Sequence, residues 1–252
     1  MLSSISKIAS VFPPPHFLAP PAAGLDISVG ALRFAELARS GIHFRLARYG
    51  EMEIPDGVFA GGEIKNRDAL KAILSDFQKK HKIRFVHASV PEQPSFILYL
   101  ELPRVPRNEI RKNLLERIEQ HVPFSSSDIV FDYEDTPCAA ADAGDTHCFG
   151  VTILPQKIVA DYTSLLAECD MEPLSLELGA QALSRALLPK KNEGACILVD
   201  IDESATGIAI VADTIVRFTA TITMGGSMLT NAIAKKLSVS TVKIGGSPVY
   251  YV

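Results

Sequence analysis

Two short segments, far apart in the chain, repeat one pattern: an apolar strand that carries an aspartate and then turns back. They are residues 24–28 (GLDIS) and residues 198–202 (LVDID). A further strand-like run follows each segment, so each predicts a β-hairpin with its aspartate near the turn. In a duplicated fold, two such hairpins would bring Asp26 and Asp200 together at a cleft between two lobes. The pair therefore favours a chain built from two similar α/β lobes.

The chemistry of such a cleft would suit a magnesium–phosphate group. Carboxylates such as Asp26 and Asp200 can hold Mg²⁺ through water. Gly225 and Gly226 open a helical pattern, where a helix N-terminus favours an anion and glycine permits close approach. An aspartate at the end of a strand is also common in ordinary turns, so neither aspartate alone separates the two interpretations. The two aspartates together with the helix start at Gly225 and Gly226 indicate a phosphate site more specifically than any one of these features.

The rest of the chain predicts three units in sequence. The first is an antiparallel meander over residues 24–54, then a helix capped by Asn66 or Asp68, then a strand at 84–90. Turns of the meander are expected near Gly30, near residues 40–41 and near Gly50.

The second unit reads as strand, helix, strand, strand, helix, and we expect a small sheet with its helices on one face. Its helix is expected to start at Asn108 and to stop at Pro123. The third unit is expected to have strands at 196–201, 207–211 and 214–221, followed by the helix after Gly226.

Composition excludes some classes of function. The 252-residue chain has a formal net charge of -4, so no global basic field attracts nucleic acid. No apolar run approaches the roughly 20 residues that span a bilayer. The four cysteines form no CxxC pair, so we expect neither a disulfide framework nor a zinc site, and a reducing cytoplasm fits best. They are Cys138, Cys148, Cys169 and Cys196.

The paired hairpins resemble the phosphate loops of the actin and sugar-kinase superfamily, and further stretches resemble the PilM family of type IV pilus assembly proteins. These are residues 54–58 (IPDGV), 62–66 (GEIKN), 100–103 (LELP), 119–124 (EQHVPF) and 224–230 (MGGSMLT). The resemblance covers roughly residues 24–237. It implies an actin-like, ribonuclease H-like duplicated α/β fold with an inserted small SHS2-like domain.

On that pattern the chain divides into four parts. Residues 1–23 form a proline-rich lead-in, and residues 24–92 with 171–192 form the first lobe. Residues 93–170 form the inserted domain used for protein contacts. Residues 193–252 form a second lobe that is incomplete against the family pattern, so we expect a truncated or fragmentary chain.

The resemblance also implies ligands and partners. PilM-type proteins bind ATP with Mg²⁺, engage the cytoplasmic tail of PilN, and so join the PilN–PilO complex at the inner membrane from the cytoplasm. Self-association is a further expectation. Asp26 and Asp200 would form the magnesium shell, and the phosphate and nucleotide contacts would come from Ser28, Ser204, Thr206, Gly225 and Gly226.

This sequence departs from the family where Ser28 and Asp202 stand at positions that are usually glycine. A carboxylate at Asp202 would repel phosphate unless it points away or recruits a cation, which would weaken nucleotide binding. We therefore expect a scaffold that is at most a weak ATPase. The alternatives are an ATP-dependent small-molecule kinase of the same superfamily and an FtsA-like cell-division protein.

Overall fold

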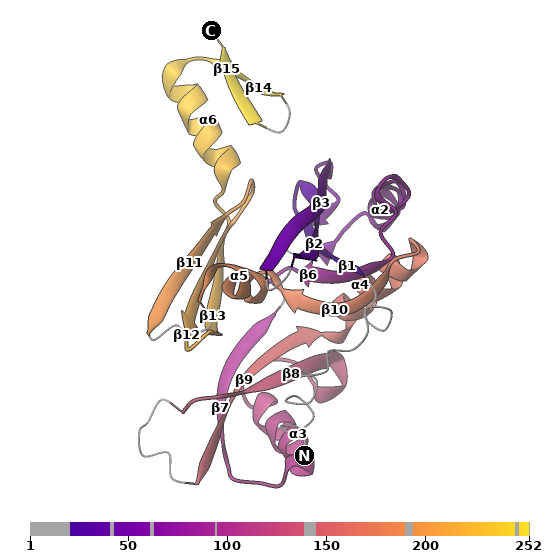
Figure 1. Ribbon diagram of the computed structural model, residues 1–252. Coiled ribbons are helices and arrows are strands. Elements are labelled where there is room, and N and C mark those ends of the chain that lie inside the picture. The colour runs from indigo at the N-terminus through magenta and orange to yellow at the C-terminus, as the bar shows by residue number, and fades with distance from the viewer. Residues whose placement is uncertain are drawn as a thin grey trace.

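The computed structural model describes residues 21–40, 43–60, 63–93, 95–138, 145–189, 194–244 and 247–251. Within those ranges the elements form one five-stranded sheet, two three-stranded sheets, two short ribbons and five α-helices (Figure 1). The mixed α/β class expected from the sequence is confirmed. Most of the proline-rich lead-in, residues 1–20, lies outside the described residues.

A five-stranded sheet forms the framework of the first lobe, in the order β10-β6-β1-β2-β3. β1, β2 and β3 form an antiparallel meander, while β6 runs parallel to β1 and β10 runs parallel to β6. The carboxyl ends of β1, β6 and β10 therefore meet at one edge, which is where open α/β sheets bind ligands. The strands are β1 (Ala22–Ser28), β2 (Ala31–Ser40), β3 (His43–Glu53), β6 (Phe85–Val90) and β10 (Glu172–Leu178).

The meander differs from the expectation at Gly50. No turn occurs there, because β3 runs through Gly50, which pairs with Phe34. A bulge between Glu36 and Leu37 takes up one extra residue of β3, and this interrupts the alternation of apolar residues in the sequence. A Cβ on Gly50 would lie 2.7 Å from the Phe34 ring and 2.8 Å from the His81 ring, so glycine is needed for packing.

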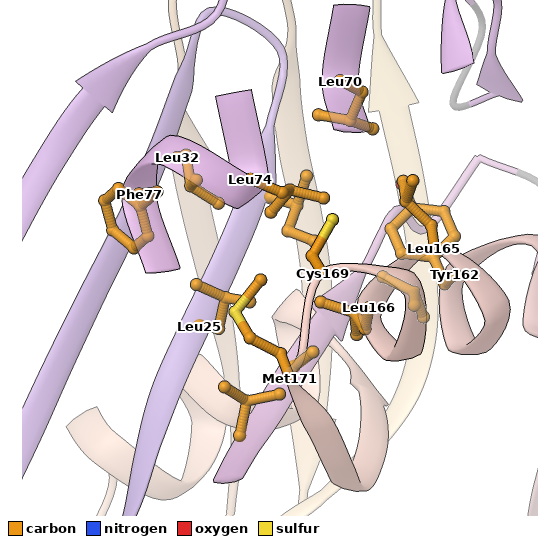
Figure 2. Close-up of a cluster of buried hydrophobic side chains, with 14 of the residues drawn as sticks. Leu25, Leu32, Leu70, Leu74, Phe77, Tyr162, Leu165, Leu166, Cys169 and Met171 are labelled. Atoms are coloured by element: carbon orange, nitrogen blue, oxygen red, sulfur yellow. The ribbon is translucent and has the colours of Figure 1, made fainter. Parts of the chain in front are cut away.

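Two helices cover one face of this sheet. The first is α2 (Arg67–His81), and Asn66 caps it as expected, its side chain accepting a hydrogen bond of 3.1 Å from the amide of Ala69. The second is α4 (Gln156–Glu168), which packs against α2. Each large apolar side chain buried between them contributes on the order of 2 kcal/mol. Figure 2 labels ten side chains of this core: Leu25, Leu32, Leu70, Leu74, Phe77, Tyr162, Leu165, Leu166, Cys169 and Met171.

The small unit has a separate core built on the sheet β7-β9-β8. Its elements are β7 (Phe96–Pro103), α3 (Arg107–Ile118), the 3-10 helix η2 (Ser126–Asp128), β8 (Ile129–Thr136) and β9 (Thr146–Pro155). The N-cap of α3 is Pro106 and not Asn108, and the helix ends at Ile118, ahead of Pro123. Pro106 has extended backbone angles, and its carbonyl accepts a hydrogen bond of 2.9 Å from the amide of Glu109, so the helix begins at Arg107.

The last helix of the small unit packs differently from the expectation. α4 contacts β8 and β9, but its buried residues Ile158, Tyr162 and Leu165 belong to the core of the five-stranded sheet. The reason is that α4 leads directly into β10, an edge strand of that sheet. The division of the chain into domains at residues 93 and 170 stays a prediction.

A second antiparallel meander, β11-β12-β13, repeats the arrangement of β1-β2-β3. α5 contacts β6 and β10 on one side and β12 and β13 on the other, so it joins the two lobes (Figure 1).

Within the described ranges, none of the helices is both long and apolar enough to cross a bilayer. The remaining elements are β4 (Phe59–Ala60), β5 (Glu63–Ile64), α5 (Gly179–Leu187), β11 (Ala195–Ile201), β12 (Thr206–Ala212), β13 (Ile215–Ile222), α6 (Gly226–Leu237), β14 (Ser240–Ile244) and β15 (Ser247–Tyr251).

One cysteine pair corrects the sequence prediction. Cys138 and Cys148 form a disulfide with a Cα–Cα distance of 5.3 Å. The pairing of Thr136 with Cys148 in the β8–β9 hairpin brings Cys138 opposite its partner. The expectation of no disulfide was wrong for this pair, because a hairpin brings together cysteines that lack any CxxC spacing.

Candidate functional site

The two aspartate-bearing hairpins face each other across the lobes. The β1–β2 turn contains Gly30 with φ +92°, a left-handed conformation that favours glycine. The β11–β12 turn is closed by a hydrogen bond of 2.9 Å from the Asp202 amide to the Ala205 carbonyl. A Cβ built on Gly30 would lie 3.0 Å from Oε2 of Glu203. The two turns are therefore in close proximity.

A cavity of about 600 Å³ lies between the hairpins, and both lobes line it. Of the residues singled out from the sequence, Asp26, Ser28, Asp200 and Ser204 line this cavity. Asp26 and Asp200 were placed together by the hairpin pattern, and Ser28 and Ser204 by the family resemblance. Their role toward a ligand stays a prediction.

Asp26 is held in place by polar neighbours. Ser89, at the end of β6, donates a hydrogen bond of 2.6 Å from its hydroxyl to Oδ1 of Asp26. Nη1 of Arg33 lies 3.9 Å from Oδ2 of Asp26 and donates to the hydroxyl of Ser28 at 3.3 Å. The Ser28 hydroxyl in turn donates to the carbonyl of Ala31. A carboxylate offers about four lone-pair sites, so Asp26 keeps capacity for water bound to a cation.

Asp202 faces the same cavity, and its carboxyl group accepts a hydrogen bond of 2.8 Å from the amide of Glu203. Burial raises the pKa of Asp202, and the charges of Asp26 and Asp200 raise it further, while Arg33 acts against them. Three carboxyl groups thus repel one another at this end of the cavity. A cation bound among them would relieve that repulsion.

Glu92 is a site residue that the sequence interpretation missed. It follows β6, and Oε1 accepts a hydrogen bond of 2.7 Å from the amide of Ala180 in the first turn of α5. A Cβ on Gly179 would lie 2.8 Å from that oxygen. Burial raises the pKa of Glu92, and the nearby charges of Asp200 and Asp26 raise it further. The carboxyl group therefore occupies the helix N-terminus, which favours negative charge.

A sequence signal for Glu92 and Ser89 does exist, since both lie at the carboxyl end of a predicted strand. The signal cannot be used without knowing that β6 pairs in parallel with β1. That pairing joins segments about 60 residues apart, and local patterns do not encode it.

Three predicted residues do not line the cavity. The hydroxyl of Thr206 donates to the carbonyl of Met224 at 2.6 Å. A Cβ on Gly225 would lie 2.5 Å from the carbonyl oxygens of Asp202 and Glu203, so this glycine admits the β11–β12 turn. The first amides of α6, including that of Gly226, donate to the same turn. The N-terminus of α6 therefore binds the protein's own backbone.

The donor set of the cavity fits a hydrated cation. Its charged lining consists of four acids and one base, namely Asp26, Glu92, Asp200, Asp202 and Arg33. Among the residues that the structure describes, no group of three side chains is arranged to hold a metal ion directly. Coordination through water, with carboxylates as outer partners, suits Mg²⁺, which keeps several of its waters.

A second cavity of about 470 Å³ lies where the small unit meets the first lobe, and Thr214 and Val216 at the start of β13 also line it. β8 is an edge strand of the small sheet, β10 is an edge strand of the five-stranded sheet, and residues of both line this cavity. We call it the groove. Its lining includes Val130, Asp132, Glu134, Gly150, Thr152, Leu154, Val159, Leu176, Glu177, Gln181 and Arg185.

The duplicated meanders, the parallel strands beside the first meander and the interlobe cavity define a protein of the actin-like ATPase fold. A family model described as type IV pilus assembly protein PilM matches residues 24–243. The chain belongs to that family.

Solved structures support the fold. A chain of the PilM-PilN type IV pilus biogenesis complex matches with a TM-score of 0.72 at 21% identity, covering 87% of this chain and 66% of that chain. The chain thus spans 66% of the length of that relative. The cytoplasmic domain of EpsL, from the type II secretion system of Vibrio cholerae, matches with a TM-score of 0.52 at 11% identity, covering 89% and 78%. The ethanolamine utilization protein EutJ of Carboxydothermus hydrogenoformans matches with a TM-score of 0.50 at 15% identity, covering 89% and 58%.

Proposed function

We propose that this PilM-family protein is a scaffold that holds the cytoplasmic tail of PilN in the groove and a magnesium–nucleotide in the cavity between its lobes. The observation that carries the proposal is the groove itself, a cavity bordered by two edge strands, β8 and β10. An extended peptide can add to an edge strand by backbone hydrogen bonds. On β8 the Phe131 carbonyl already accepts from Arg111 and the Tyr133 amide already donates to Asp132, so β10 is the edge proposed for strand addition.

The lining of the groove supports a peptide over a small polar metabolite. One end is apolar, with Val130 and Leu154 opposite each other and Leu176 nearby in the lining. The other end is polar, where the amide of Gln181 donates to the hydroxyl of Thr152 at 2.9 Å. Apolar pockets beside free backbone groups are the features with which proteins bind extended segments.

The nucleotide part of the proposal rests on the cavity between the hairpins. Asp26 and Asp200 would hold a hydrated magnesium ion, and the hydroxyls of Ser28 and Ser204 would contact phosphate. When bound, the metal would neutralise the phosphates and the surrounding carboxylates. Asp202 would make nucleotide binding depend on that cation, because free phosphate would meet uncompensated negative charge.

A small-molecule kinase needs a general base beside the hydroxyl group of its substrate. Glu92 in the cavity accepts a hydrogen bond from the amide of Ala180, so its carboxylate is engaged with α5. This arrangement of the charged groups accords with a scaffold. Robust phosphotransfer to common sugars would favour the kinase alternative.

Through PilN, the protein would join the PilN–PilO complex at the cytoplasmic face of the inner membrane. Self-association and weak ATP hydrolysis are further parts of the proposal.

Calorimetry with a synthetic peptide of the PilN tail tests the groove. We expect micromolar affinity or better, about 8 kcal/mol. Two matched variants locate the site, because Val130 in the groove and Val29 in the interlobe cavity are both 39% exposed. Val130→Asp should abolish binding of the peptide, and Val29→Asp should leave it intact. No binding to the folded wild-type protein would refute the PilN role.

Fluorescent ATP titrations test the cavity. Binding is expected with Mg²⁺ and lost with EDTA, and Asp26→Asn and Asp200→Asn should each weaken it roughly tenfold. Asp56→Asn, in an exposed turn outside the cavity, is the control. Equal binding in all four proteins would contradict the magnesium role of the two aspartates.

A further inference from the structure

One face of the β11-β12-β13 sheet is apolar and lies open to solvent. The opposite face packs on α5, where Ala209 of β12 shares a buried cluster with Ala180. Side chains alternate along a strand, so Ile197, Val199 and Ile201 of β11 lie on the other face. Their exposed fractions are 66%, 58% and 61%. Three large aliphatic side chains in a row on one strand are thus left in water.

The repeat of the two hairpins shows what this face is built for. When the hairpins are aligned on their aspartates, the three exposed positions of β11 become the counterparts of Ala23, Leu25 and Ile27 of β1. These residues are only 1%, 2% and 3% exposed, because they belong to the core that α2 and α4 cover. The second lobe thus exposes, in the described part of the chain, the strand face that the first lobe buries.

The exposed face extends across all three strands. In the register of the sheet, Ile210 pairs with Ile197 on one side and with Phe218 on the other. The other same-face positions of β12 and β13 are Thr206, Ile208, Ala220 and Ile222, so the register places no charged residue on this face. Six of its side chains are more than a third exposed, and they leave roughly 600 Å² of apolar surface bare, which is the upper end of what a monomer normally shows. We call this surface the open face; its six exposed residues are Ile197, Val199, Ile201, Ile210, Phe218 and Ile222.

We propose that the open face is the interface of a symmetric dimer, in which the β11-β12-β13 sheets of two copies pack face to face. A two-fold axis opposes a surface to itself, so a charged surface would meet like charges, whereas the open face carries none. Two open faces packed together would bury roughly 1,200 Å², which reaches the lower limit of a stable interface. Sheets that pack in this way interdigitate their side chains at a spacing of about 10 Å. This inference rests on the self-association in the proposed function and names its surface.

Sedimentation equilibrium of the 252-residue chain over a wide range of concentration tests the dimer. The wild-type protein should fit a monomer–dimer equilibrium, and sulfate should strengthen the dimer, as it strengthens apolar contacts. Val199→Lys should raise the dissociation constant of the dimer about tenfold or more, because the interface would bury an unpaired ammonium group. Leu37→Lys is the matched control, because Leu37 is 62% exposed and lies on β2, outside the open face. Its effect should be less than about twofold.

A charge-swap experiment tests whether the face meets itself. Val199→Lys and Val199→Glu should each be monomeric where the wild-type protein is a dimer. An equimolar mixture of the two variants should associate more strongly than either alone, because opposite charges then lie across the interface. Circular dichroism checks that each variant is folded, which is expected because the substituted side chain is exposed in the monomer.

Three outcomes would overturn the inference while leaving self-association standing. They are a dimer that persists in Val199→Lys, equal losses in Val199→Lys and Leu37→Lys, and open-ended growth of the wild-type protein with concentration. A wild-type protein that stays monomeric would refute self-association itself, and hydrogen exchange that is slow along β11 in this monomer would show that another segment covers the open face. Binding of the PilN tail and of nucleotide is measured separately, so these failures can be distinguished from failure of the other parts of the proposed function.

Discussion

Two adjacent glycines should differ sharply in their tolerance of a methyl group. A Cβ on Gly225 would lie 2.5 Å from the carbonyl oxygens of Asp202 and Glu203, whereas a Cβ on Gly226 would meet its nearest neighbour at 3.8 Å. The contacts at Gly225 are with backbone, so either the β11–β12 turn or the start of α6 must shift by nearly 1 Å to reach ordinary van der Waals distance.

The cost of Gly225→Ala follows from what that shift would break. The amide of Gly226 donates to Asp202 and that of Ser227 donates to Glu203, both at 2.9 Å. Two such hydrogen bonds at about 1 kcal/mol each give about 2 kcal/mol. Typical overpacking costs of 1–3 kcal/mol agree with this value. For a chain of this size the midpoint of thermal unfolding would fall by about 4–8 °C.

The assay is urea denaturation followed by circular dichroism, together with hydrogen exchange of the Gly226 and Ser227 amides. Gly225→Ala should lose about 2 kcal/mol and exchange both amides faster. Gly226→Ala should be neutral or slightly stabilising, because alanine is the better helix former. Equal stability of the two variants, with unchanged exchange, would refute the argument that Gly225 is required by close approach of the turn.

Three further predictions concern buried polar groups. The Tyr162 hydroxyl is buried without a hydrogen-bond partner in the described part of the chain. Tyr162→Phe should therefore raise the free energy of unfolding by about 1 kcal/mol, whereas Tyr133→Phe should change it little. A lower free energy of unfolding in Tyr162→Phe would show that the hydroxyl is hydrogen-bonded. Burial lowers the pKa of His81 below 6.5, so stability should be complete above that pH and fall as the pH drops through the folded-state pKa; urea midpoints from pH 8 to 5 should show a decline that His81→Leu lacks. Burial raises the pKa of Glu92 above 4.5, so its contribution is present below that pH and is lost as the pH rises through the folded-state pKa; Glu92→Gln, which keeps an acceptor for the Ala180 amide, should remove this loss in the same titration.

Local patterns predicted much of the fold because they depend on neighbouring residues. Asn66 caps α2 as expected, since capping needs only a side-chain oxygen and an amide three residues on. The prediction of a turn at Gly50 was wrong. The bulge opposite Glu36 and Leu37 interrupts the alternation of apolar and polar residues in β3, and that interruption resembles the end of a strand. The prediction that Asn108 caps α3 was wrong, because the N-cap is Pro106, whose carbonyl accepts from the amide of Glu109.

The sequence by itself determined the two aspartate hairpins, since an apolar strand followed by a tight turn is written in consecutive residues. It therefore predicted that Asp26 and Asp200 share a cavity, which the structure shows. Only the tertiary structure decided that Glu92 joins them, that α4 packs with the first lobe and that Cys138 meets Cys148. The physical reason is that these contacts depend on which strands pair and which helix faces meet, and those choices are set by burial of apolar surface between segments far apart in the chain.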